Sequence, residues 1–487
     1  MKKKAKKGSQ ATPLDKRRRQ GSKLRSPFHQ LGDKVAWSSW KDDHLPDVIW
    51  LAIICAVRDQ KERIEIFREI AEAARKEFLG EDHASPTHYF LSKISFDSFR
   101  KIVAPAIAHD DIRESLKILA TVDAMPDRGH WRELFGDVAA KDEDWQTLAK
   151  GVALCLDHQS QESTDIRWLK IIYLFAIEKM VVPEPMAERF LQYPYVGDMR
   201  QVRPMIRSAE MATRSMFKGE TDERVTMECE PFWAEMLACT RCITKPEDAK
   251  TEEDDDALKE DIYSTITELY EHFYSSVQNT NVDARLDSAF GISFYSLSLC
   301  LEMASLPSRH LATGRVVLRT ITELAITLSF LRAKDDDAIW MQHRQYGSGQ
   351  TALAFLKSSA GEDVPSHIDL EKLEVLANED VWFETRDIDL GSWSKMNLRD
   401  MSIAAGRKDL YDRYYDWTSG FVHGHWGAIR DATFTTCLNP LHRLHRVPQP
   451  MKPLPSVVTE CCKVTNQSLE MLNALYPSFK RRITKHY

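Results

Sequence analysis

Apolar residues recur at helical spacing along almost the whole chain, in successive segments of about ten to twenty residues. The pattern is clear between Asp47 and Glu77, where Ile49, Ile53 and Val57 begin a run of apolar positions. Glycine is scarce, at 19 of 487 residues. All-β and dinucleotide-binding folds need more glycine for turns and phosphate loops. The sequence therefore predicts an all-α, multi-domain helical protein.

Charge indicates where the domains end. Residues 1–25 carry eleven Lys or Arg against one acid, Asp15, and form a solvated tail or a contact for nucleic acid or an anionic surface. The segment 245–261 holds nine acids and, apart from Leu258, no large apolar residue, which is typical of a linker. The predicted parts are a basic disordered arm (1–35), an N-terminal helical domain (36–244), an acidic linker (245–261) and a C-terminal helical domain (262–487).

The chain carries no apolar stretch long enough to span a bilayer. Its longest uninterrupted run, Val48 to Val57, has ten residues, about half of what a transmembrane helix needs. The first residues also lack the apolar core of a secretory signal. The sequence predicts a cytoplasmic protein without a membrane partner.

Nine widely scattered cysteines are predicted to be free thiols, as expected in a reducing compartment. Cys239 and Cys242 have the spacing of half a zinc site, but a zinc site needs a second pair of ligands. Neither Cys229 nor the adjacent Cys461 and Cys462 supplies that pair, so we expect no metal and no cofactor. A small basic cluster that could bind phosphate lies further along the chain, at His442, Arg443, His445 and Arg446.

One helix of the C-terminal half combines charged and apolar positions. Arg315, Arg319 and Glu323 fall at i, i+4 and i+8, on one stripe of a predicted helix. Because an unpaired buried charge is costly, Arg319 and Glu323 must pair or meet a ligand. We expect Arg315 to extend its charged end to solvent.

A second segment of this half carries a stripe of polar-tipped side chains. The stripe has a spacing of four residues, and its last member is followed closely by His425. If the helix is continuous at Gly420, these groups lie along one line. The members of the stripe are Tyr411, Tyr415, Ser419 and His423.

These motifs, together with the intervening Trp393-Ser394 segment, resemble an uncharacterised bacterial helical family that we associate with the HEPN superfamily. The resemblance covers roughly residues 265–440. It implies a C-terminal helical bundle, a homodimer as the assembly, and RNA or a nucleotide as the ligand. Many HEPN domains are metal-independent ribonucleases in defence and toxin systems. Their usual Arg-to-His spacing occurs here only at Arg481 and His486.

Metal-free RNA cleavage needs a base for the ribose 2′-hydroxyl and a cation for the phosphate. The resemblance and this chemistry assign His423 as general acid or base and Arg319 as the phosphate clamp, with Glu323 and Ser419 completing the catalytic set. Substrate would bind to Tyr415, Tyr411 and His425.

Two hypotheses stay open at this point. In one, the chain is a defence or toxin-like effector whose C-terminal bundle binds or cleaves RNA, while the N-terminal domain docks a partner protein. In the other, the same polar groups form a network that fixes the fold of a non-catalytic nucleotide-binding or interaction scaffold.

Overall fold

The computed structural model describes residues 14–25, 38–81, 84–196, 199–216, 226–245, 256–305, 307–361, 364–379 and 387–484. The chain divides into two compact units. The N-terminal unit comprises Met1–Lys245 together with Cys437–His445, and the C-terminal unit comprises Pro246–Thr436 together with Arg446–Tyr487. Most of the acidic segment at 245–261 lies outside the described residues.

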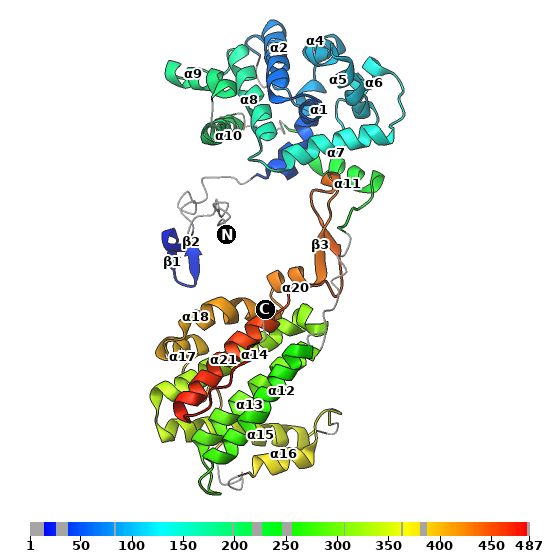
Figure 1. Cartoon of the computed structure of the whole chain (residues 1–487). Helices are drawn as coiled ribbons and strands as arrows, with labels where there is room; N and C mark the ends of the chain where they lie inside the picture. The colour runs from blue at the N-terminus through cyan, green and yellow to red at the C-terminus, as the bar shows by residue number, and fades with distance from the viewer. Residues whose placement is uncertain are drawn as a thin grey trace. The chain divides into compact units, whose positions relative to one another are not determined.

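The N-terminal unit is helical, as the sequence predicts (Figure 1). Its α-helices are α1 (Ile49–Val57), α2 (Gln60–Phe78), α3 (His88–Leu91), α4 (Phe96–Ile107), α5 (Asp110–Leu116), α6 (Arg128–Phe135), α7 (Asp142–Leu156), α8 (Gln161–Ala176), α9 (Glu184–Gln192), α10 (Met199–Met216) and α11 (Cys229–Cys239). Short turns of other helix types include η3 (Trp40–His44) and η10 (Pro440–His442).

Helix α1 forms the centre of the N-terminal unit. It is apolar on all sides, and its residues Ile49 to Ala56 are all buried, which is what a helix without a polar face requires. The long apolar run of the sequence is therefore a core helix. The helical pattern between Asp47 and Glu77 is interrupted at Asp59, whose carboxylate accepts a hydrogen bond from the Glu62 N–H and caps α2.

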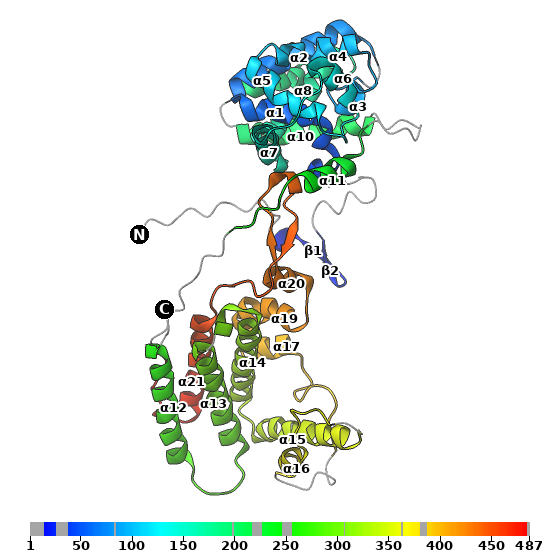
Figure 2. The same cartoon turned by 90° about the vertical axis from the view of Figure 1, so that its right-hand side faces the viewer.

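The C-terminal unit contains the longest helices of the chain (Figure 2). Its helices are α12 (Asp256–Ser276), α13 (Ala284–Ser305), α14 (Ala312–Lys334), α15 (Asp337–Ser359), α16 (Leu370–Ala377), α17 (Leu398–Ala404), α18 (Lys408–Leu410), the π-helical turn η9 (Tyr411–Tyr415), α19 (Asp416–Val422), α20 (Trp426–Thr433) and α21 (Val458–Leu475).

Four of these helices, α12, α13, α14 and α21, pack side by side as a bundle. Their shared core contains Phe290, Leu328 and Leu469, each almost fully buried. Helices α17 and α19 and the turn η9 pack against α14. This packing brings the segment that begins at Tyr411 next to the Arg-x-x-x-Glu helix predicted from the sequence.

The strands in the described part of the chain form two short antiparallel hairpins. Strands β1 (Arg18–Gln20) and β2 (Lys23–Arg25) pair within the basic arm, so this part of the predicted disordered arm has a local hairpin. Strands β3 (Phe434–Thr436) and β4 (Arg446–Pro448) pair in the C-terminal unit, and the loop between them belongs to the N-terminal unit. None of the helices in the described ranges combines the length and apolar character that crossing a bilayer requires.

Candidate functional site

Arg319 lies at the centre of a polar cluster on α14. Its Nη2 donates a hydrogen bond to the Tyr415 hydroxyl at 2.8 Å, and its Nη1 lies 3.2 Å from a carboxylate oxygen of Glu323. The guanidinium carbon also lies 4.7 Å from the centre of the Tyr415 ring, within range of a cation–π interaction. The predicted pairing of Arg319 is thus present, and Tyr415 is a second partner.

Tyr411 extends this cluster by one more ring. Its ring stacks on that of Tyr415, with 5.0 Å between the ring centres. Burial, followed by the nearby charge of Asp416, raises the pKa of Tyr411 above its usual value. Tyr411 therefore serves as a neutral stacking group at neutral pH.

The polar stripe predicted from Tyr411 to His423 does not lie on one continuous α-helix. Residues Tyr411–Tyr415 form a π-helical turn, and α19 ends at Val422. His425 N–H bonds to the carbonyl of Gly420 at 2.8 Å, and Gly424 has φ of +61°. These two features define a Schellman motif, in which glycine supplies the left-handed residue that ends the helix.

His423 is therefore the C-cap residue that follows α19, and His425 is the residue that precedes α20. His423 lies eight residues, or about 12 Å along a helix axis, beyond Tyr415. Within the described ranges no hydrogen bond or ion pair joins Arg319 to His423, and the Ser419 carbonyl accepts a hydrogen bond from the His423 N–H. The single site predicted for these residues is thus two separate groups.

Arg315 does not extend to solvent as the sequence predicted. Its side chain is buried, and its Nη2 donates to the carbonyl of Pro455 at 2.6 Å. Burial lowers the pKa of Arg315. The loop before α21 supplies a carbonyl at this point, which no periodicity on α14 could reveal.

The second group forms an exposed surface around the α19–α20 turn. Its members are Trp417, His423, His425 and Trp426, which we call the aromatic–histidine surface. Trp417 and Trp426 are 55% and 54% exposed, and both histidines are also exposed. The two imidazole rings lie 5.9 Å apart, centre to centre.

The members of the aromatic–histidine surface are held by close packing between α19 and α20. The Trp417 indole lies against α20, because a Cβ at Gly427 would be in ordinary van der Waals contact with its ring at 3.6 Å. The guanidinium of Arg446 lies 5.3 Å from the centre of the Trp426 ring. A cation thus accompanies the exposed rings.

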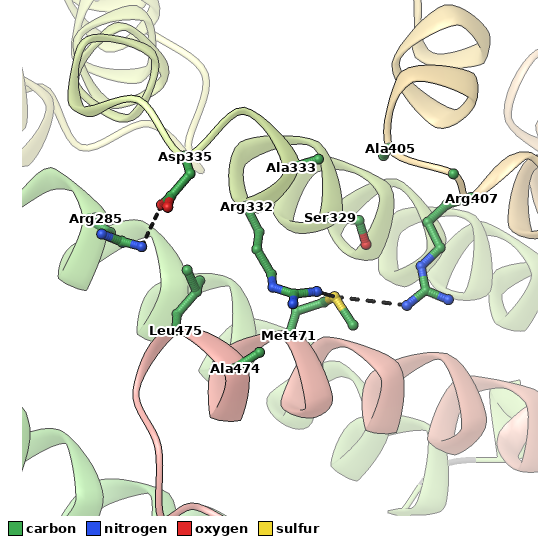
Figure 3. Close-up of a pocket in the computed structure, with 11 residues that line it drawn as sticks. Arg285, Ser329, Arg332, Ala333, Asp335, Ala405, Arg407, Met471, Ala474 and Leu475 are labelled. Atoms are coloured by element: carbon green, nitrogen blue, oxygen red, sulfur yellow. Dashed lines mark hydrogen bonds and ion pairs between the residues drawn. The ribbon is translucent and has the colours of Figure 1, made fainter.

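A cavity of about 530 Å³ lies elsewhere in the C-terminal unit, between α14, α21 and the residues after α17 (Figure 3). Arg332 and Arg407 reach toward each other over the Met471 sulfur, which lies 3.2 Å and 3.8 Å from their guanidinium nitrogens. Arg285, at the rim, is paired with Asp335. No carboxylate pairs with Arg332 or Arg407 in the described ranges, so the cavity has an excess of positive charge.

The other residues named by the sequence have structural partners. Trp393 packs against His343 and Phe330. Arg481 pairs with Asp261 at 2.7 Å, and His486 lies outside the described residues. The Arg481–His486 spacing therefore marks no described site.

Comparison with known proteins gives a match over the same region. Residues 294–436 match the model of a family of unknown function (DUF5677). This range includes Arg319, Glu323, Tyr415 and the α19–α20 turn. No curated protein and no solved structure matches the chain.

Two features escaped the sequence-based reasoning. The exposure of Trp417 and Trp426 does not follow from the sequence, because tryptophan side chains are on average highly buried. Their neighbours Gly424 and Gly427 were a usable signal, because glycines between aromatic residues indicate a tight turn or a close approach. Arg332 and Arg407 come from distant segments, and nothing in their local sequence points to a shared cavity.

Proposed function

We propose that the C-terminal unit binds single-stranded RNA through the aromatic–histidine surface, as part of a defence or toxin-like effector. The observation that carries the proposal is the exposure of two indole rings and two imidazole rings around one helix–turn–helix joint. Contiguous exposed apolar side chains mark interaction sites, whereas single exposed ones are ordinary. Unstacked bases of RNA stack on such rings, and arginine accompanies them as a cation.

The same surface supports a cleavage reaction without a metal. One of the two imidazoles, His423 in the resemblance-based assignment, removes the proton from a ribose 2′-hydroxyl. The 2′-oxygen attacks the adjacent phosphorus, and the bond from phosphorus to the 5′-oxygen breaks. His425 donates a proton to that leaving oxygen, so the products are a 2′,3′-cyclic phosphate and a 5′-hydroxyl. Arg446, whose guanidinium lies 5.3 Å from the centre of the Trp426 ring, supplies a cation for the phosphate charge.

Binding is tested by fluorescence anisotropy with a short labelled single-stranded RNA at two salt concentrations. Since one base–aromatic stack is worth about 1–3 kcal/mol, Trp417→Ala and Trp426→Ala should each weaken binding about 5- to 150-fold. Tyr263→Ala is the matched control, because Tyr263 is 55% exposed on α12, away from this surface. Equal loss in all three variants, or no RNA binding by the wild type, would refute the proposal.

Cleavage is tested on the same RNA in excess EDTA, with the wild type beside His423→Ala and His425→Ala. Because both side chains are exposed, neither substitution should change the free energy of unfolding by more than about 0.5 kcal/mol. The melting temperature of each variant should therefore stay close to that of the wild type. We expect loss of the cyclic phosphate product in each variant and no cleavage of a 2′-deoxy substrate. Product formation that persists in both variants would contradict the assignment.

The cavity around Arg332 and Arg407 favours a second candidate function, the binding of a nucleotide or another phosphate compound without catalysis. Two guanidinium groups without carboxylate partners match the geometry of a phosphate. Isothermal titration with pyrophosphate should detect binding that Arg332→Gln and Arg407→Gln remove, whereas Arg399→Gln, an exposed arginine on α17, should keep it. Absence of heat with the wild type would dismiss this candidate.

A further inference from the structure

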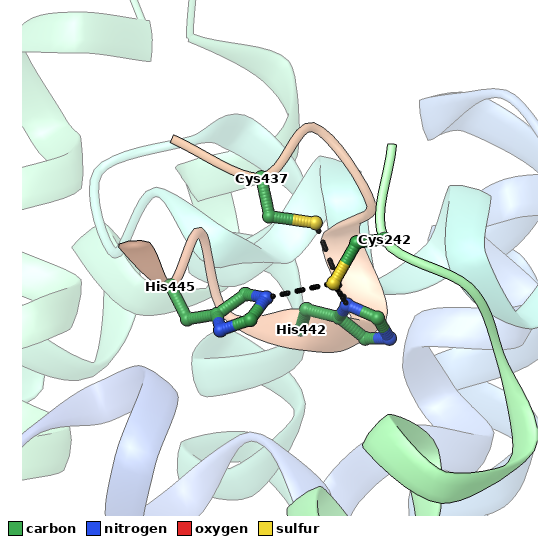
Figure 4. Close-up of side chains that lie close together, drawn as sticks. All are labelled: Cys242, Cys437, His442 and His445. Carbon is green, nitrogen blue, oxygen red and sulfur yellow. Dashed lines mark hydrogen bonds between the residues drawn. The ribbon is translucent and has the colours of Figure 1, made fainter. Parts of the chain in front are cut away.

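A separate group of side chains in the N-terminal unit has the composition of a metal site. Cys242, Cys437, His442 and His445 each offer one ligand atom, and these four atoms lie within 4.8 Å of one another (Figure 4). Cys242 follows α11, and the other three residues lie on the loop between β3 and β4. All four belong to the same compact unit.

The distances between ligand atoms fit one small ion. Cys242 Sγ lies 3.5 Å from His442 Nδ1 and 3.2 Å from His445 Nε2, and Cys437 Sγ lies 3.4 Å from His442 Nδ1. With zinc–sulfur bonds of about 2.3 Å and zinc–nitrogen bonds of about 2.0 Å, tetrahedral ligand atoms lie about 3.3–3.8 Å apart. Three of the six distances between ligand atoms are thus close to this range, and the other three are within 4.8 Å.

The surrounding hydrogen bonds hold the ligands in orientation. His442 Nε2 lies 2.9 Å from Thr240 Oγ1, which directs the other ring nitrogen, Nδ1, toward the two sulfurs. The Ile243 N–H lies 3.4 Å from Cys437 Sγ, where it can stabilise a thiolate. Partners of this kind fix the ring orientation and donor strength of metal ligands.

The backbone conformation of the loop between β3 and β4 also favours this arrangement of ligands. Arg443 and Leu444 both have left-handed φ angles, 52° and 58°, which non-glycine residues seldom adopt. They turn the chain so that His442 and His445 meet the same sulfur. The loop is closed by a bond from the Cys437 N–H to the His445 carbonyl and anchored by Leu441 in the core of the N-terminal unit.

We propose that Cys242, Cys437, His442 and His445 bind one structural zinc ion. Two thiolates and two imidazoles at tetrahedral spacing select zinc, and four protein ligands leave no open position for substrate. On binding, the two thiols release their protons to solvent, so Zn²⁺ and two thiolates form a neutral centre suited to a partly buried site. The inference is independent of the RNA proposal, which concerns the C-terminal unit.

Metal analysis of the full-length protein, purified without chelator, tests the site. The wild type should hold one zinc per chain. The control variant Cys239→Ser should hold the same amount, because Cys239 is exposed and lies outside the group. His445→Ala, whose side chain is only half-buried, should lose the zinc, and Thr240→Val should weaken zinc binding about 10- to 100-fold in competition with a chelating dye.

Cobalt substitution of the wild type protects the test against a variant that fails to fold. Co²⁺ in this site should give the visible bands of tetrahedral cobalt and a near-ultraviolet sulfur-to-cobalt charge-transfer band. The proposal is overturned by a wild type that binds neither zinc nor cobalt, by a Cys242–Cys437 disulfide in mass spectra of protein kept under reducing conditions, or by equal zinc loss in Cys239→Ser.

Discussion

Replacing Tyr415 by phenylalanine measures the hydrogen bond to Arg319 apart from the packing of the tyrosine ring. The substitution removes the hydroxyl that accepts from Arg319 but keeps the ring 4.7 Å from the guanidinium. Losing a hydrogen bond to a charged group costs about 1.5–3 kcal/mol when the donor is left buried. The Arg319 side chain is 18% exposed and keeps Glu323 as a partner, so we expect the lower end, about 1.5 kcal/mol.

The Glu323→Gln variant is the internal control for this value. Its carboxylate is 43% exposed, so the ion pair with Arg319 should contribute at most about 0.5 kcal/mol. The assay is unfolding in urea, detected by hydrogen exchange of peptides from α14, so that it reports on the C-terminal unit alone. A Tyr415→Phe variant within 0.5 kcal/mol of the wild type, about the noise of such values, would refute the reasoning. Reduced RNA affinity at unchanged stability would instead assign Tyr415 to the ligand.

Three further predictions concern packing and pH. Gly151→Ala should destabilise the protein by about 1–3 kcal/mol in equilibrium unfolding, because the new Cβ would lie 2.7 Å from the Ala52 carbonyl oxygen. Gly347→Ala in α15 should instead stabilise it by up to about 1 kcal/mol, because the space around Gly347 is open. Leu441→Ala should cost the N-terminal unit about 2–5 kcal/mol, measured by hydrogen exchange of α7 and α11. Burial lowers the pKa of His343 below 6.5, so its contribution to stability is complete above that pH. As the pH falls, His343 takes up a proton in the unfolded chain before it does so in the folded one. The free energy of unfolding should therefore decline by at most about 1.4 kcal/mol per pH unit. In urea titrations, the His343→Gln variant should lack this contribution to the slope.

The helices of the C-terminal unit could be predicted from the sequence because their apolar positions follow the helical period over long segments. The helix predicted around Arg315, Arg319 and Glu323 is α14, Ala312–Lys334. The helix ends were harder to predict. The Schellman motif at Gly424 could have been inferred, since a glycine after a helical stripe favours a helix end. The π-helical turn at Tyr411–Tyr415 could not, because tertiary packing rather than residue type decides such a turn.

The candidate site was predictable only where its partners share a helix. Arg319 and Glu323 are four residues apart, so their ion pair follows from helical geometry. Tyr415 joins them from another helix, and its spacing from Arg319 carries no signal. The exposure of Trp417 could not be predicted either, because a single sequence does not tell whether a tryptophan faces the core or the solvent.

The cysteine–histidine group illustrates the same limit most clearly. Cys242 was weighed as half of a zinc site and set aside because no second pair of ligands lies nearby in the chain. Its neighbours in space lie far along the sequence, with His442 at a separation of 200 positions. Short-range spacing identifies a metal site only when one hairpin or helix carries the ligands. Here the relevant spacing is that from Cys437 to His442 and His445. These three ligands lie on one loop, and one further thiolate would complete a four-ligand set. A search for incomplete ligand sets, each matched with unpaired cysteines elsewhere, would have joined this trio to Cys242.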